Sequence, residues 1–456
     1  METVFPRKKA IRRKGIQSTF NALVRSSSFG GLFLMAVTVF TLIAANVDSL
    51  SGILDIWKLK ANIAIGNFVL EMTLLHWVND ALMAVFFFVV GLEIKREMVV
   101  GELSSFKKAA LPIFAAIGGM VLPAIIFYSI NAGTESQHGW GIPMATDIAF
   151  SLGVISLLGR GVPVSLKIFL TALAIVDDIG AIIVLAIFYP SHALSPQFLM
   201  LALGVVAFLF IINRLNIHNT AAYLIPGVLL WYFVYQSGIH ATIAGVLLAM
   251  FIPSKSPINE VRFYVRSKYY LEKFKAASNG QVNILANSKQ LGIIHSLHTQ
   301  IRQVNPLINK FEHRINPYVT YSIMPIFAFA NAGVAFDGLP SITSLSTLSL
   351  GIFFGLVVGK PVGIFIATFL AVKLKIADLP EEIKWSQMFG VGIIAGIGFT
   401  MSIFINSLAF SNINLINEGK IAIMVTSVIA GIIGLIVLKA SLGKTPKKVK
   451  YKKIKE

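Results

Sequence analysis

The chain has 456 residues, of which 56% are hydrophobic and only 13% are charged, and its formal net charge is +18. A soluble globular protein carries about 25% charged residues, so this composition excludes an ordinary water-soluble domain. The sequence contains no cysteine, which excludes disulfides and thiolate metal sites.

Long windows of the sequence, such as Ala109 to Thr134, contain no charged residue. A helix of about 20 apolar residues crosses a hydrocarbon layer about 30 Å thick. Membrane β-barrels instead alternate in polarity over roughly ten-residue segments, which these windows do not do. The sequence therefore predicts an all-α integral membrane protein.

Apolar windows taken in chain order predict twelve transmembrane helices. We expect them at residues 27–47, 74–98, 109–131, 138–159, 164–189, 197–213, 219–236, 239–253, 318–337, 346–373, 385–411 and 418–438. The segments between and around them are a basic cytoplasmic segment at 1–26, a polar cytoplasmic loop at 254–317 and a basic cytoplasmic tail at 439–456. The first apolar run follows basic residues, as in a signal peptide, but its length favours a retained helix.

The distribution of basic residues predicts the orientation. With the N-terminus inside, 35 of the 39 Lys and Arg residues fall on the cytoplasmic side and three outside. Both termini are therefore expected in the cytoplasm. The positive charge reflects topology rather than a nucleic-acid partner, with attraction of the tails to anionic lipid as a secondary effect.

Four ionisable residues stand deep inside predicted spans: Asp147, Asp177, Asp178 and Lys360. Each costs about 2.5–3.5 kcal/mol or more to insert there. A structural ion pair accounts for one aspartate with Lys360 but not for three carboxylates with one amine. Asp177 and Asp178 lie about 100° apart around a helix, so one can face a cavity while the other faces a neighbouring helix. Two carboxylates this close titrate as a coupled pair.

Two of the predicted spans are interrupted. One contains Gly139, Gly141 and Pro143 before Asp147, and the other contains Gly392, Gly396 and Gly398. Grouping spans 3–5 and 10–12 gives two three-helix units of opposite orientation, each with a broken middle helix, which is a transporter architecture. Asp147 could offset the positive N-terminal ends of half-helices and Lys360 the negative C-terminal ends. Without the charges, such glycines would indicate only close helix packing.

Several longer stretches carry a family resemblance. They are Trp77–Ala84, Gly91–Glu97, Ala145–Phe150, Leu173–Ile182, Phe329–Gly333, Val358–Pro361 and Gly396–Ser402. In their order and residues they resemble the NhaA-type sodium/proton antiporters. The resemblance implies a bacterial inner-membrane transporter rather than an enzyme. It further implies electrogenic exchange of sodium or lithium for protons, activation at alkaline pH, and no cofactor.

The resemblance also implies roles for individual residues. Asp178 would be the main Na⁺ ligand, and Asp177 would either work with it or pair with Lys360. Thr146 and Asp147 would lie where the broken helices cross. The candidates for pH sensing are Glu93, Arg96, Glu97, His240, Glu312 and His313.

Two further expectations concern the loops. Family members form homodimers through an outer hairpin, and part of the outer loop at 48–73 alternates in polarity as a strand does. The loop at 254–317 is longer than usual for the family, and Asn316 stands where a second histidine is often found. This departure does not affect the transport site, but it leaves open the pH at which the protein becomes active.

Two other functions compete with antiport. An intramembrane aspartic protease also uses two membrane aspartates, but they must face each other from different helices, whereas Asp177 and Asp178 are adjacent. A sodium-coupled symporter of an organic solute would share the inverted-repeat architecture. Peptide cleavage would favour the first, and solute-dependent sodium uptake the second.

Overall fold

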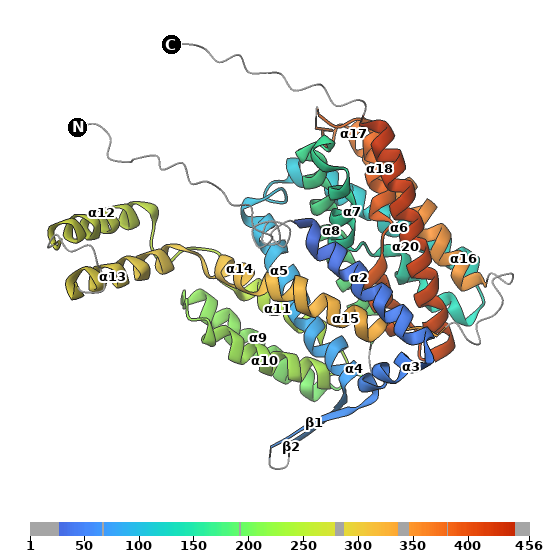
Figure 1. Ribbon diagram of the computed structural model, residues 1–456, viewed down its shortest axis with the longest axis horizontal. Helices are drawn as coiled ribbons and strands as arrows, with labels where there is room; N and C mark the ends of the chain where they lie inside the picture. The colour runs from blue at the N-terminus through green and yellow to red at the C-terminus, as the bar shows by residue number, and fades with distance from the viewer. Residues whose placement is uncertain are drawn as a thin grey trace, which may run out of the picture.

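The computed structural model describes residues 27–65, 68–190, 193–278, 287–335, 346–380 and 382–442. Within these ranges the regular structure is helical apart from one small hairpin (Figure 1). Seven helices have the length and apolar character needed to cross a membrane, or nine spans if each of two bent helix pairs counts as one. The prediction of an all-α membrane protein is confirmed.

The first part of the chain runs from a transmembrane helix into the outer loop and back. Its elements are α2 (Ser27–Asn46), α3 (Asp48–Ser51), η1 (Gly52–Lys58), β1 (Lys60–Ile65), β2 (Phe68–Thr73), α4 (Leu74–His76), η2 (Trp77–Leu82) and α5 (Met83–Val100). The strands pair antiparallel, with Lys60 opposite Thr73 and Ile63 opposite Leu70. The hairpin expected in the loop at 48–73 is therefore present.

The middle of the chain supplies the helices around the broken span. They are α6 (Phe106–Asn131), η3 (Glu135–Met144), α7 (Ile148–Leu157), η4 (Gly159–Gly161), α8 (Val164–Phe188), α9 (Pro196–Arg214), α10 (Ala221–Gln236) and α11 (Thr242–Phe251). The helices α10 and α11 are apolar but shorter than a full span.

The predicted loop at 254–317 is largely helical. It contains α12 (Glu260–Ala276), α13 (Ser288–Val304) and α14 (Leu307–Tyr318). The helices α12 and α13 pack against each other and project from the body of the molecule (Figure 1). The helix α14 continues through η6 (Val319–Ile323) into α15 (Met324–Asn331). The span predicted from residue 318 therefore starts inside a helical run, whose first part in α14 is polar and has low hydropathy.

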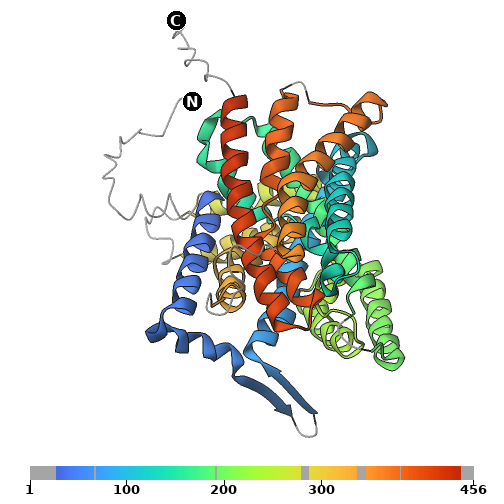
Figure 2. The same ribbon diagram turned by 90° about the vertical axis from the view of Figure 1, so that its right-hand side faces the viewer.

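The last part of the chain packs against the middle. Its elements are α16 (Thr347–Phe353), η7 (Phe354–Gly359), α17 (Lys360–Lys373), α18 (Trp385–Ala395), α19 (Phe399–Ala409) and α20 (Ile413–Ser441). The helices α6 and α17 approach closely, since a Cβ atom at Gly118 or Gly363 would overlap the backbone of the other helix. Both views place the start of α2 and the end of α20 away from the β1–β2 hairpin (Figures 1 and 2).

Two helix pairs are bent at the expected interruptions. The axes of η3 and α7 differ by 51°, and those of α18 and α19 differ by 46°. In the first break, residues 145–147 have no helical structure, and Asp147 begins α7 as its N-cap. In the second break, Gly396 allows close approach, because a Cβ atom there would overlap the carbonyl oxygen of Leu356.

Candidate functional site

The two helix breaks meet inside the molecule. The backbone N–H of Asp147 donates to the carbonyl of Ile397 over 2.7 Å. The hydroxyl of Thr146 lies 2.9 Å from the carbonyl oxygen of Ala395, at the end of α18. Each break leaves backbone groups without helical hydrogen bonds, and groups of the other break provide some of the missing partners.

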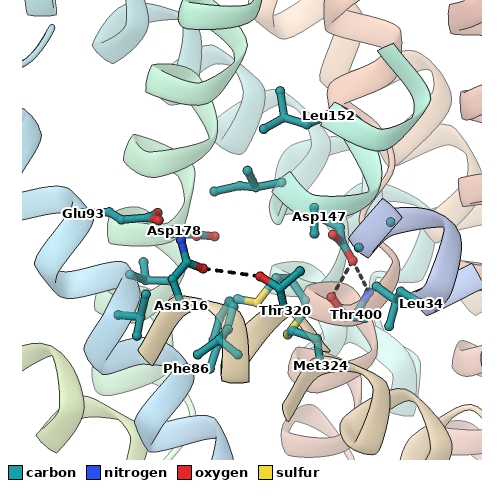
Figure 3. Close-up of a pocket in the computed structure, with 18 of the residues that line it drawn as sticks. Leu34, Phe86, Glu93, Asp147, Leu152, Asp178, Asn316, Thr320, Met324 and Thr400 are labelled. Carbon is teal, nitrogen blue, oxygen red and sulfur yellow. Dashed lines mark hydrogen bonds between the residues drawn. The ribbon is translucent and has the colours of Figure 1, made fainter. Parts of the chain in front are cut away.

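Asp147 interacts with the N-terminal ends of two half-helices. One carboxylate oxygen accepts from the backbone N–H of Phe150 in α7 over 2.9 Å. The other accepts from the N–H of Thr400 in α19 over 3.1 Å and from the Thr400 hydroxyl (Figure 3). Because helix N-termini carry partial positive charge, one carboxylate can offset two of them at this crossing.

Asp177 faces Lys360 in a fully buried ion pair. Its Oδ2 lies 2.9 Å from the Lys360 ammonium, and both side chains are completely excluded from solvent. The Thr146 hydroxyl lies 2.7 Å from the same Oδ2, and it can donate its single proton either there or to Ala395. Lys360 also donates to the carbonyl of Met144, the last residue of η3. The lysine therefore interacts with a carboxylate and with a helix C-terminus at once.

Asp178 occupies a different environment, although it is the next residue of α8. It lines a cavity of about 330 Å³, whose polar lining also includes Thr146, Asp147, Thr400, Glu93 and Asn316. The Asp178 side chain is only 1% exposed, and its Oδ1 has no hydrogen-bond partner among the described residues. Figure 3 shows it across this cavity from Asp147 and beside Glu93. A buried carboxylate oxygen without a partner favours a proton or a cation as its ligand.

The pH-sensing candidates on α5 and α14 other than His313 separate into two places. Arg96 forms ion pairs with Glu312 and, over 3.2 Å, with Glu97. Glu97 also accepts from the backbone N–H of Glu102 over 2.9 Å. Glu93, one turn earlier on α5, lines the cavity of Asp178 instead.

The two histidine candidates lie outside both groups. His240 is buried just before α11 and does not line the cavity, and His313 is exposed on α14. Neither is brought next to the aspartates in the part of the chain that the structure describes.

Sequence reasoning missed two polar residues of this site. Thr400 stood inside a recognised motif but received no role, although it donates two hydrogen bonds to Asp147. Asn316 was noted only as a departure from the family, yet it lines the cavity with Asp178. The spacing of Asn316 four residues after Glu312 placed both on one side of a helix, but only the fold brings that side to the cavity.

Residues 21–438 match the family described as Na⁺/H⁺ antiporter 1. The chain belongs to this family. It is 46% identical over 422 residues to the Na⁺/H⁺ antiporter NhaA of Helicobacter pylori strain G27, a match that covers 92% of this chain and 95% of that protein.

Similar proteins also come from other bacteria. The NhaA antiporter of Oleidesulfovibrio alaskensis is 45% identical over 92% of this chain and 93% of its own length. That of Koribacter versatilis is 43% identical over 94% of this chain and 93% of its own length. The chain is thus a multi-pass membrane transporter of the NhaA type and not an enzyme, and Na⁺ and H⁺ are its substrates rather than cofactors.

Proposed function

We propose that this antiporter exchanges cytoplasmic Na⁺ or Li⁺ for external protons across a bacterial inner membrane, electrogenically and with activity that rises at alkaline pH. The observation that carries the proposal is Asp178, a buried carboxylate on a cavity with one oxygen that has no partner among the described residues. Such a group can bind a proton or a cation, but not both in the same position.

Competition for Asp178 is sufficient to couple the two fluxes. Sodium favours oxygen ligands, and Thr146, Asp147 and Thr400 supply oxygens on the same cavity. If only the protonated or the cation-bound protein reorients, each sodium that leaves is exchanged for protons that enter. Asp177 contributes through its pairing with Lys360, which can end when the charge at Asp178 changes. Lys360 then either offsets charge or itself carries a proton.

Movement would follow from the two broken helices. We propose twelve spans with both termini in the cytoplasm, and two inverted units made of spans 3–5 and 10–12. The crossing joins these units through Asp147 and Thr146, which contact both breaks. Rocking of one unit against the remaining helices around the aspartates would alternate access to the two faces of the membrane.

Regulation by pH would act through the cytoplasmic ion pairs. Arg96 holds Glu97 on its own helix α5 and Glu312 on α14, so it connects two elements. Loss of the charge on either glutamate would weaken this connection. Because α14 also carries Asn316, such a change can reach the cavity.

Dimerisation would use the outer hairpin. A two-stranded sheet has two edges with unpaired backbone groups, and the strands β1 and β2 form no larger sheet within the described residues. Pairing with the hairpin of a second copy would satisfy those groups and give a homodimer within the lipid bilayer.

The decisive experiment is sodium-induced proton movement in liposomes that contain the purified protein, with and without an imposed membrane potential. Exchange that speeds up or slows down with the potential supports electrogenic antiport. Sodium uptake that requires an added organic solute would support a symporter instead. Repeating the measurement with Li⁺ and between acid and alkaline pH tests the remaining parts of the proposal.

A further inference from the structure

One wall of the Asp178 cavity has no role in the exchange as described so far. It is formed by Glu93 on α5, Asn316 near the end of α14, and Thr320 in η6. The segment η6 is a π-helical turn, an irregularity that is frequent at functional sites. Glu93 lies about one turn before Arg96 on α5, and Asn316 lies four residues after Glu312 on α14, so this wall is on the side of the cavity toward the predicted cytoplasmic loop.

Asn316 and Thr320 form a hydrogen-bonded pair on this wall. The Thr320 hydroxyl donates to the Asn316 Oδ1 over 3.3 Å, across one helical turn. Figure 3 shows the amide with its oxygen toward Thr320 and its nitrogen toward Asp178 and Glu93. In this orientation the amide presents its nitrogen to the two carboxylates.

The chemistry of this pair allows a second orientation. A primary amide has an acceptor oxygen on one side and a donor nitrogen on the other, and a hydroxyl can either donate or accept. If the Asn316 amide turns over, its oxygen faces the carboxylates and Thr320 accepts from its nitrogen. Thr320 thus remains a hydrogen-bond partner of the amide in both orientations.

We propose that Glu93, Asn316 and Asp178 form an inner transit site for a monovalent cation, in which the Asn316 amide turns its oxygen toward the ion when the ion arrives. The inference rests on the proposed antiport, because it concerns the route by which Na⁺ reaches Asp178. Asp178 supplies a carboxylate oxygen that is buried, lines the cavity and has no partner among the described residues. Asn316 supplies a neutral oxygen, and Glu93 supplies the charge that attracts the ion into the cavity.

This donor set fits a cation that passes through rather than one that stays. Two carboxylates with one amide suit a weakly held monovalent ion of the size of Na⁺ or Li⁺. A transit site has to bind strongly enough for entry and weakly enough for release, and a neutral amide ligand serves both requirements.

The test compares the apparent KM for sodium with the maximal exchange rate of the full-length protein in liposomes at one alkaline pH. Asn316→Leu keeps the approximate size but removes the oxygen, and it should raise the KM for Na⁺ about tenfold, as expected for the loss of one interaction with a charged group. The rate at saturating sodium should be unchanged. Thr320→Val should raise the KM for Na⁺ less than Asn316→Leu does. Thr320→Ser keeps the hydroxyl, so its KM for Na⁺ should equal that of the unaltered protein. Thr368→Val is the matched control, since the Thr368 hydroxyl donates only within α17, to Ile364 and Phe365.

A second variant keeps the inference testable if Asn316→Leu does not fold. Asn316→Asp retains an oxygen and adds a charge, so it should lower the KM for Na⁺ and also slow maximal exchange, because the ion is held too tightly. Sodium binding to the purified protein, followed calorimetrically, should change in the same directions. Unchanged KM and binding in both Asn316 variants would overturn the transit site while leaving the antiport proposal intact. Absence of exchange in the unaltered protein would instead remove the antiport proposal.

Discussion

Asp177 and Asp178 are neighbours in α8, yet they belong to two different regions of the molecule. Asp177 lies in a closed centre, where Lys360 and Thr146 contact it and its side chain is completely buried. Asp178 lies in an open centre, where it lines a cavity with Glu93 and forms no ion pair with a described residue. The Oδ1 atom of each aspartate lacks a hydrogen-bond partner within the described structure, so the cavity and the ion pair make the difference. The rotation of about 100° between successive helix residues separates them.

The difference indicates that the two carboxylates have different roles, one mainly in stability and the other mainly in exchange. In the closed centre the charges of Asp177 and Lys360 balance each other. Removing one of them leaves the other as a buried, unpaired ion, which destabilises the protein. The open centre lines a cavity that an ion or a proton can enter, so a change there should affect exchange before stability. The predictions below test this division, from the largest expected effect to the smallest.

The largest effect is expected at the open centre. Asp178→Asn should abolish sodium/proton exchange in liposomes, because a neutral amide cannot alternate between a proton and a cation. The variant should insert and melt as the unaltered protein does. Asp80→Asn, the same change at a carboxylate in η2 that does not line the cavity, is the control and should retain exchange. Normal exchange in Asp178→Asn would remove the central assignment.

The second effect concerns the closed centre. Lys360→Ala should lower the free energy of unfolding by about 3–5 kcal/mol, because Asp177 is left buried without its partner. Asp177→Asn should likewise destabilise the protein and nearly abolish exchange. Thermal unfolding in detergent measures the stability of both, and Lys420→Ala is a control at a buried lysine in α20 for which the described residues provide no ion pair.

The same lysine variants decide between the two roles of Lys360. If it offsets charge, Lys360→Ala should be impaired most at high pH, where the carboxylates are ionised, and Lys360→Arg should keep partial activity. If it carries a proton, Lys360→Ala should exchange without sensitivity to the membrane potential, and Lys360→Arg should fail because arginine keeps its proton. Potential-sensitive exchange in Lys360→Ala contradicts the carrier role.

A third and smaller effect is expected where the closed centre meets the helix crossing. Thr146→Val removes the hydroxyl that lies between Asp177 and Ala395, at nearly constant side-chain volume. It should lower the free energy of unfolding by about 1–3 kcal/mol, the cost of a buried polar group that has lost its partner. Thr368→Val serves again as the comparison, and equal melting temperatures for the two variants would speak against a special role for Thr146.

The smallest effect is expected at the ion pairs beyond the open centre. Glu312→Gln and Glu97→Gln weaken the contacts of Arg96 and should shift the activity profile along the pH axis without lowering the maximal rate. Glu102→Gln, close by on the same side of the molecule, should leave the profile in place. Exchange rates measured between acid and alkaline pH provide the test. Loss of exchange at every pH would mean that these glutamates belong to the transport path.

Competition between the two ions also predicts the pH dependence of binding in the unaltered protein. The apparent affinity for sodium should weaken steeply as the pH falls, because protons then occupy the carboxylates of the open centre. Titration of exchange against sodium at several pH values measures this. An affinity that is constant over two pH units would be inconsistent with a shared site.

Much of this arrangement follows from the sequence alone. Uninterrupted apolar windows predicted the membrane helices, since nothing else accommodates 20 or more such residues in one run. The cost of a charge in hydrocarbon identified Asp147, Asp177, Asp178 and Lys360 before any fold was considered. The glycines and Pro143 predicted both broken helices, and both pairs are bent at those positions.

Only the tertiary structure decided which of these groups meet. The pairing of Lys360 with Asp177 rather than Asp178 depends on how α6 packs against both α17 and α8, which brings together residues far apart in the chain. The cap that Asp147 provides for α19 depends on the crossing of two breaks about 250 residues apart. The position of Asn316 beside Asp178 depends on α14 continuing through η6 into α15, which the hydropathy of the polar residues before 318 does not indicate. Local patterns determine which helices form and which charges they carry, but side-chain partners depend on long-range packing that no local pattern encodes.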